Sequence, residues 1–220
     1  MWYNIMNFYL HLAVYVMEIT IVCPYSFGAN TYIIFSDGHA LVVDPSVSVE
    51  KITRAVAERG AVLDGILLTH GHFDHTVALD TLRSATSVKA YIHKNDAEML
   101  TDGRKNAYYD FYGKESRYSP AEYLLDDKDA IPLGNEELRV IHTPGHTGGS
   151  VCFLCDGFIV TGDTLFSDSI GRTDLWSGDM TAMRTSLEKL RSLPRTLKIY
   201  PGHGAPALLG DALDNSAYYL

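Results

Sequence analysis

The sequence predicts an α/β fold in which two β-sheets pack against each other with helices on their outer faces. Two groups of short β-branched and apolar segments occur along the chain, and helical segments accompany each group. Metal-capable side chains flanked by glycine follow several of these segments, as expected where strand ends meet at a common edge. The 220 residues, 46% of them hydrophobic and 20% charged, suffice for the core of one domain.

The first group begins with three strands that we expect to run antiparallel. A turn at residues 36–38 separates the second strand from the third, and Asp44 ends the third. Ser48 is placed to cap a helix that stops at Gly60. The expected elements are strands at 18–22, 31–35 and 39–43, a helix at 48–59, a central strand at 65–68, a helix at 76–84, a strand at 89–92 and a helix at 95–100.

Residues 101–129 are polar, aromatic and irregular. Loops of this length are uncommon unless they serve a function, and an aromatic loop suits a lid over a pocket. A surface loop tied down by its tyrosines is an equally good interpretation. The aromatic residues concerned are Tyr108, Tyr109, Phe111, Tyr112, Tyr118 and Tyr123.

A second group of strands and helices follows this loop. The expected elements are strands at 137–142, 151–154 and 158–161, a helix at 180–192, a strand at 196–200 and a short last helix after Pro206. Because both groups combine strands with helices, two packed sheets with helices outside are the natural architecture.

The formal net charge of −9 and the pI near 5.4 argue against a nucleic-acid partner, because phosphate binding requires a basic face. A small-molecule substrate is the better expectation. Three cysteines, an odd count without the spacing of a disulfide framework, favour a reducing, cytoplasmic location. Cys152 and Cys155 are three residues apart on a predicted strand, so we expect them to face opposite sides rather than form a redox pair or a metal site.

Residues 1–17 form an apolar stretch without a charged side chain. The stretch falls short of the roughly 20 residues of a membrane span, and it lacks the basic region and cleavage site of a signal peptide. We therefore expect no clear membrane span and interpret it as an N-terminal extension packed on the body or on a partner, which is compatible with an oligomer. A mis-assigned start, with Met17 as initiator, is the alternative. Residues 18–220 are expected to form a single domain.

Residues 70–75 carry four metal-capable side chains and follow the predicted central strand. Alternate side chains of an extended segment point the same way, so His70 and His72 can bind one ion. Asp74 and His75 come next and are placed to hold a second ion beside the first. Imidazole and carboxylate groups together are what zinc or iron sites require.

Three further segments each place one candidate ligand at a strand end or turn. Glycine flanks each of these ligands and lets the backbone bring a short side chain to a crowded centre. The ligands are His146, Asp163 and His203. They would converge with residues 70–75 if the strands lie side by side.

With these motifs the chain resembles the metallo-β-lactamase superfamily, and within it the glyoxalase II-like hydrolases of short bacterial type. The resemblance covers the chain from about residue 17 to its end. It implies the four-layer αββα metallo-β-lactamase sandwich, with two divalent metal ions at one edge. Zinc is the first expectation, and iron or manganese are the alternatives. The implied ligands are His70, His72 and His146 for the first metal and Asp74, His75 and His203 for the second, with Asp163 bridging both.

Two divalent cations carry more positive charge than Asp74, Asp163 and a bridging hydroxide remove. Such a centre can generate hydroxide near neutral pH and stabilise the oxyanion formed at a carbonyl group, so no serine or cysteine nucleophile is required. This chemistry suits thioesters and lactones. We therefore predict a metal-dependent hydrolase in which Asp74 and Asp163 are catalytic, and the resemblance implies a thioester such as an S-acylglutathione as substrate.

Arg172 occupies the place of a basic residue that helps hold glutathione in glyoxalase II, so it is the candidate for substrate binding. A structural ion pair with Asp168 or Asp174 is the alternative. Asp174 and Ala205 stand where tyrosines are expected from the family pattern.

Other functions are compatible with the same residues. Persulfide dioxygenases share the fold and also show the Gly-Arg-Thr-Asp sequence found at residues 171–174. They use one iron, which would correspond to a site at His70, His146 and Asp163. A lactonase is a third alternative, and a non-catalytic metal-binding module is a fourth.

Overall fold

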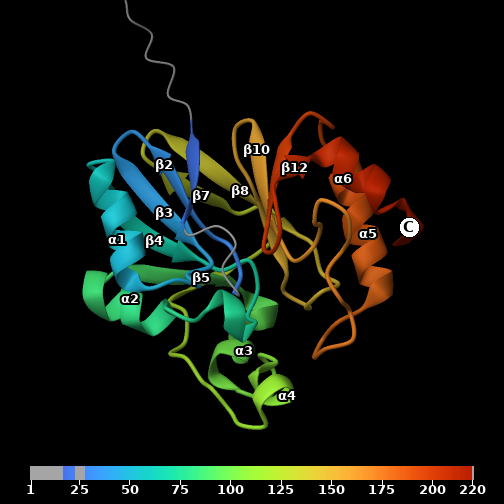
Figure 1. Ribbon diagram of the computed structural model, residues 1–220, viewed down its shortest axis with the longest axis horizontal. Helices are drawn as coiled ribbons and strands as arrows, with labels where there is room; N and C mark the ends of the chain where they lie inside the picture. The colour runs from blue at the N-terminus through green and yellow to red at the C-terminus, as the bar shows by residue number, and fades with distance from the viewer. Residues whose placement is uncertain (1–16, 23–27, 220) are drawn as a thin grey trace, which may run out of the picture.

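The computed structural model describes residues 17–22 and 28–219, which form two six-stranded sheets packed face to face (Figure 1). The predicted extension at residues 1–16, and Cys23, lie outside the described residues. Met17 is described, and its side chain is buried in the core between the sheets. Within these two ranges no helix has the length and apolar character needed to cross a membrane.

The first sheet contains β1 to β6 in chain order. β1, β2 and β3 are antiparallel, as predicted, whereas β3, β4, β5 and β6 run parallel to one another. The carboxyl ends of β3 and β4 therefore lie at the same edge. The strands are β1 (Glu18–Val22), β2 (Thr31–Ser36), β3 (His39–Val43), β4 (Val62–Leu67), β5 (Lys89–His93) and β6 (Tyr123–Leu125).

The second sheet has the order β12-β11-β10-β9-β8-β7. β10 and β11 are parallel and the other neighbouring pairs are antiparallel, so β8, β10 and β11 all run in the same direction. The strands are β7 (Ala130–Leu133), β8 (Glu136–His142), β9 (Val151–Leu154), β10 (Phe158–Gly162), β11 (Lys198–Pro201) and β12 (Ala207–Leu208).

Helices cover the outer face of each sheet. α1 (Val49–Glu58) and α2 (Leu79–Thr86) pack on the first sheet, and α5 (Met180–Arg191) and α6 (Leu209–Asn215) pack on the second (Figure 1). α3 (Ala97–Thr101) and α4 (Tyr108–Tyr112) lie beyond the ends of the sheets. The predicted four-layer αββα sandwich is thus confirmed.

The alternation of side chains along the strands creates the separate cores of this sandwich. On β2, Tyr32 and Ile34 point into the core between the sheets, whereas Ile33 and Phe35 point toward α1 and α2. All four side chains are buried. A strand that is apolar on both faces is what a sheet covered on both sides requires.

The two described cysteines lie on opposite faces of the second sheet, as predicted. Cys152 belongs to the core under α5 and α6, whereas Cys155 belongs to the core between the sheets. Both are free thiols. Burial raises the pKa of Cys152 to about 11, so its thiol is protonated and unreactive at neutral pH.

Several boundaries differ from those predicted. The helix expected at 76–84 begins three residues later, because a 3-10 turn at Phe73–His75 takes up the chain after the histidine cluster. Residues 101–129 are not irregular throughout, since they include α4 and β6. β7 and β12 were not predicted, because Pro132 interrupts the pattern of β7 and β12 contains only two residues. β7 is an edge strand, the position where a sheet tolerates proline.

The core between the sheets offers a test of this packing. Leu67 of β4 is fully buried there, whereas Leu124 of β6 is 58% exposed. We expect Leu67→Ala to lower the free energy of unfolding by about 2–4 kcal/mol, because it removes buried methyl groups and leaves a cavity. The matched change Leu124→Ala should cost less than about 0.5 kcal/mol. Urea unfolding of both variants measures the difference, and equal losses would contradict the assigned packing.

Candidate metal centre

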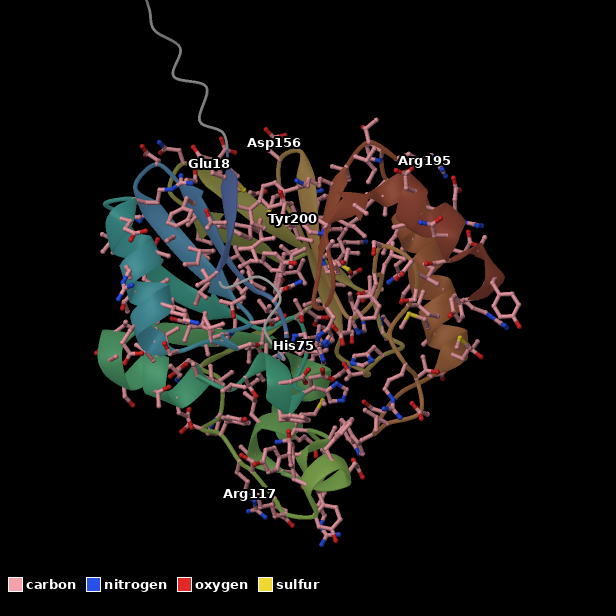
Figure 2. The ribbon with its side chains drawn as sticks, viewed as in Figure 1. Glu18, His75, Arg117, Asp156, Arg195 and Tyr200 are labelled. Atoms are coloured by element: carbon pink, nitrogen blue, oxygen red, sulfur yellow. The ribbon has the colours of Figure 1, made fainter. Side chains whose placement is uncertain are left out.

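The carboxyl ends of strands from both sheets meet at one edge, and the predicted ligands come directly after these ends. The ligands are His70, His72, Asp74 and His75 after β4, His146 after β8, Asp163 after β10 and His203 after β11. Figure 2 shows His75 at this end of the sandwich, far from the strand ends marked by Glu18 and Asp156. The shared strand direction thus brings together side chains that are far apart in the sequence, such as His70 and His203, which 133 positions separate.

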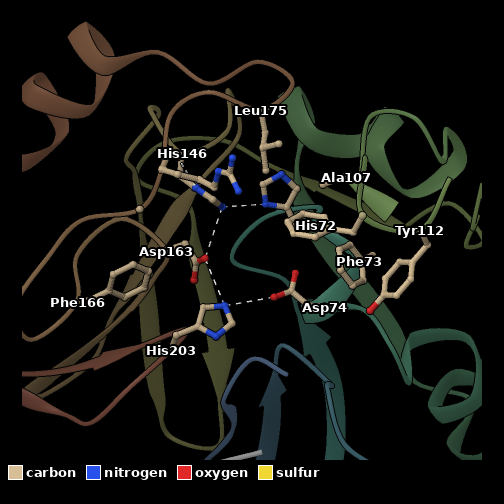
Figure 3. A pocket seen from close by; sticks show the side chains of 13 residues that line it. His72, Phe73, Asp74, Ala107, Tyr112, His146, Asp163, Phe166, Leu175 and His203 are labelled. Atoms are coloured by element: carbon tan, nitrogen blue, oxygen red, sulfur yellow. Dashed lines mark hydrogen bonds and ion pairs between the residues drawn. The ribbon is translucent and has the colours of Figure 1, made fainter. Parts of the chain in front are cut away.

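The seven predicted ligands form three overlapping groups. Within each group one nitrogen or oxygen atom per residue lies within 4.8 Å of the others. Nδ1 of His72 is 2.8 Å from Nε2 of His146, and Nε2 of His203 is 3.2 Å from Oδ2 of Asp74 (Figure 3). The groups are His70, His72 and His146; His70, His75 and Asp163; and Asp74, His75 and His203.

Asp163 lies between the other ligands. Its Oδ2 is 3.5 Å from Nε2 of His146 and 3.5 Å from Nε2 of His203, and its Oδ1 is 3.4 Å from Nε2 of His75. The carboxylate therefore faces both halves of the cluster (Figure 3).

The donor atoms fit a metal site by an independent criterion. Nε2 of His70, His72 and His75 and Oδ1 of Asp163 are buried and have no hydrogen-bond partner. A buried polar atom without a partner is costly, and native proteins rarely contain several in one place. Metal coordination satisfies such atoms, and imidazole and carboxylate are the ligands that zinc and iron accept.

Comparison with known proteins now decides the family. Residues 25–203 match the model of the metallo-beta-lactamase superfamily. The chain belongs to this superfamily. It is also 37% identical over 179 residues to the "Probable metallo-hydrolase YqgX" of Bacillus subtilis, a match that covers 80% of this chain and 85% of that protein.

Two crystal structures resemble this member of the metallo-beta-lactamase superfamily. The B3 metallo-beta-lactamase BLEG-1 has a TM-score of 0.85 and 30% sequence identity, over 92% of this chain and 99% of that chain. TTHA1623 in a di-iron-bound form has a TM-score of 0.76 and 29% identity, over 90% of this chain and 100% of that chain. The superfamily sandwich thus spans nearly all of the chain.

Hydrogen bonds to the far side of the imidazoles fix their orientation, as is usual around metal ligands. Nδ1 of His75 lies 2.8 Å from the carboxylate of Asp44, and Nδ1 of His146 lies 2.7 Å from the backbone oxygen of Arg172. Asp44 also accepts hydrogen bonds from the backbone N–H and the hydroxyl of Thr69. The sequence predicts only that Asp44 ends a strand; its position one residue after β3, beside β4, is the available clue to this further role.

Burial and charge set the protonation of the histidines. Burial lowers the pKa of His70 well below its ordinary value and that of His72 to about 3. Both imidazoles are therefore neutral at neutral pH, the form that binds metals. Burial also opposes the charged form of His75, but Asp163 and Asp44 outweigh it and raise the pKa of His75 well above its ordinary value.

The carboxylates are ionised despite their burial. Burial alone would raise the pKa of Asp74, but the charge of His75 and the hydrogen bond with His203 lower it to about 2. Burial also opposes the ionisation of Asp163, yet the neighbouring histidines, His75 above all, hold its pKa far below the usual range. Asp163 is buried and Asp74 is partly buried, and their negative charges require positive charge nearby, which divalent cations would supply.

Asp96 joins the two loops that carry the histidines of the first group. This fully buried carboxylate accepts hydrogen bonds from the backbone N–H of Gly71 at 3.1 Å, the backbone N–H of Gly149 at 2.7 Å and the hydroxyl of Thr147 at 2.6 Å. Burial raises the pKa of Asp96 to about 6, so the group is ionised at neutral pH and acts as an acceptor. The sequence predicts only a short helix around Asp96, and no local pattern marks its role.

The loop of His203 is held against β2. The side-chain N–H₂ group of Asn30 donates to the backbone oxygens of Pro201, at 3.0 Å, and Gly204, at 2.9 Å. Any side chain at Gly202 would collide with Asp163 and with the imidazole of His75. Glycine at this position therefore lets the backbone approach the cluster, as the sequence predicted for the glycines beside the ligands.

A pocket of about 530 Å³ opens over the cluster. Phe111 and Tyr112 of α4 line it, which supports the lid interpretation for this part of the aromatic loop. Tyr123 instead stacks on Tyr91 within the first sheet. Arg172 also lines the pocket, and it forms the predicted ion pair with Asp174 through two hydrogen bonds. Its role in substrate binding stays a prediction.

We predict that Asp96 stabilises both histidine loops. Asp96→Ala leaves the N–H groups of Gly71 and Gly149 buried without an acceptor and should lower the free energy of unfolding by roughly 3 kcal/mol. Amide hydrogen exchange should accelerate at both glycines. Exposed Asp168 provides the control, since Asp168→Ala should change neither measurement. Unchanged exchange in Asp96→Ala would contradict this role.

Proposed function

We propose that this protein is a dinuclear metal-dependent hydrolase that cleaves acyl compounds, with thioesters as the substrate class. S-acylglutathione is the reference thioester for the first tests. The position of Asp163, which faces both halves of the ligand cluster, carries this proposal because it matches a carboxylate shared by two ions. The likeness to a metallo-hydrolase and to a di-iron protein supports it.

The proposed first metal site consists of His70, His72 and His146. The second consists of Asp74, His75 and His203, and Asp163 bridges the two. Zinc is the first candidate, because three imidazoles with an open position form a common catalytic zinc site. Iron is the alternative suggested by the di-iron form of TTHA1623, and manganese is a further one.

Divalent cations bound there would supply a hydroxide at neutral pH and polarise the carbonyl oxygen of a substrate. The residues of the chain would hold these cations and orient the groups around them. Asp74 and Asp163 contribute the negative charge that retains the cations, and the bond between Asp44 and His75 fixes one imidazole ring. We therefore assign the catalytic role to Asp74 and Asp163.

The lining of the pocket favours water as the nucleophile. Among the described residues that line it there is no serine, cysteine or lysine. Cys152 and Cys155 are buried in the cores. A thioester fits this lining because its thiolate, from a thiol of pKa about 8.5, leaves without a general acid. A cytoplasmic location remains a prediction that agrees with free thiols.

Elemental analysis of natively purified protein, followed by a panel of thioesters, lactones and a β-lactam, tests the proposal. We expect two zinc ions per chain and thioester turnover that is lost with a chelator and restored by zinc. One iron per chain with oxygen uptake on glutathione persulfide would instead establish the dioxygenase alternative. Metal binding without any turnover would indicate a non-catalytic module.

Asp163→Ala should lose metal and activity together. The variant removes the carboxylate shared by the two proposed sites, so we expect less than one metal ion per chain and a fall in kcat/KM of about a thousandfold or more. Circular dichroism checks that the variant is folded. Asp168→Ala, an exposed aspartate in the loop after β10, is the matched control and should retain both properties. Full activity in Asp163→Ala would remove this residue from the centre.

A further inference from the structure

We infer that the pocket selects an uncharged substrate with an aromatic or similarly bulky apolar acyl group, and that it disfavours a thiol carrier bearing several carboxylates, such as glutathione. This inference rests on the proposed function, since it names the substrate class of the same site. Two independent features carry it. They are the apolar walls of the pocket and the pairing of its arginine, Arg172, with Asp174.

The ligand cluster lies between two apolar walls. Phe73, Phe111 and Tyr112 form one wall, with the Phe73 ring centroid 5.7 Å from that of Phe111 and 5.6 Å from that of Tyr112. Phe166 lies on the opposite side, beside Asp163 and His203, and Leu175 is seen above the ring of His72 (Figure 3). An apolar group attached to a carbonyl at the cluster would therefore meet hydrocarbon on both sides.

The wall on α4 is incompletely covered. Phe111 is 57% exposed and Tyr112 is 58% exposed, although both turn a face toward the pocket. Ligand-binding pockets are typically lined by aromatic and other apolar side chains of this kind. A bound aromatic group would bury this surface and gain ring contacts of the kind already present between Phe73 and its neighbours.

Apart from the proposed metal ions, the pocket offers little unpaired positive charge to a polyanion. All 18 lysine and arginine residues of the chain fall within the described ranges, because residues 1–16 and 23–27 contain none. Of these cations, Arg172 is the one that lines the pocket. Its guanidinium group donates hydrogen bonds of 2.6 and 2.8 Å to the two carboxylate oxygens of Asp174, so the pair as a whole has no net charge.

Neighbouring cations on the aromatic loop are also paired. Arg104 bonds to Glu115 at 3.1 Å, and Lys105 pairs with Glu98. Glutathione carries two carboxylates, which need cationic or N–H donors when they bind in a pocket. Arg104 and Lys105 are already paired with acidic side chains. A thiol carrier without carboxylates needs no such donors and therefore loses no binding energy for lack of them.

Binding of two non-hydrolysable thioethers to the purified holoenzyme tests the inference without turnover. The ligands are S-(2-phenylethyl)-N-acetylcysteamine, which is uncharged, and S-(2-phenylethyl)glutathione, and calorimetry measures both dissociation constants. We expect the uncharged thioether to bind at least about tenfold more tightly. Equal or tighter binding of the glutathione thioether, or no binding of either, would overturn the inference.

Variants of α4 test the apolar wall. Phe111→Ala and Tyr112→Ala should each weaken binding of the uncharged thioether by about fivefold to tenfold. Tyr109→Ala is the matched control on the same helix, because Tyr109 packs on Arg104 and does not line the pocket. Unchanged affinity in both Phe111→Ala and Tyr112→Ala would show that the wall does not contact the ligand.

Asp174→Ala tests the role of charge. The change frees Arg172, so affinity for the glutathione thioether should rise by about fivefold or more, and Arg172→Ala in the same background should abolish the gain. No gain in Asp174→Ala would contradict neutralisation of Arg172 as the cause of the preference. Absence of bound metal and of thioester turnover would refute the proposed function, whereas the ligand preference is measured separately by calorimetry.

Discussion

Burial of charge at the edge of two apolar sheets is the constraint on which this site depends. Asp44, Asp96 and Asp163 are 1%, 0% and 8% exposed, and carboxyl groups so placed are stable only where donors or cations surround them. Asp44 and Asp96 each accept three hydrogen bonds from neighbouring loops. Because these donors belong to the segments that carry the histidines, the bonds that offset the burial of the carboxylates also position the imidazoles.

Much of the architecture could be predicted because its causes are local. β2 is buried on both faces, with Tyr32 and Ile33 facing different cores, and this arises from an apolar run within six residues. The histidine cluster at residues 70–75 contains four of the seven candidate ligands, and glycine marks the approach of the other three. Strand direction accounts for their convergence, since strands that run the same way end at one edge and place their next residues there.

The supporting residues could not be predicted because their partners are far away in the chain. Asp96 bonds to groups 25 and 53 residues distant, at Gly71 and Gly149, and Asn30 holds a loop more than 170 residues later. Neither residue has a recognisable spacing to its partners. α4 escaped prediction for a different reason, since a five-residue helix with no buried side chain has too short an apolar pattern to detect.

The candidate metal ligands and the walls of the pocket therefore belong to parts of the molecule with different constraints. The ligands come after strands whose side chains fill the two cores, so a change there disturbs packing and charge together. No residue of α4 belongs to the three core clusters of the described chain, and Phe111 and Tyr112 are more than half exposed. Substitutions in α4 can therefore alter which small molecule binds in the pocket while the cluster of histidines and aspartates keeps its geometry. Membership of the metallo-beta-lactamase superfamily accordingly constrains the chemistry of this protein more closely than its substrate, for which the proposed determinants are a short helix and one ion pair between Arg172 and Asp174.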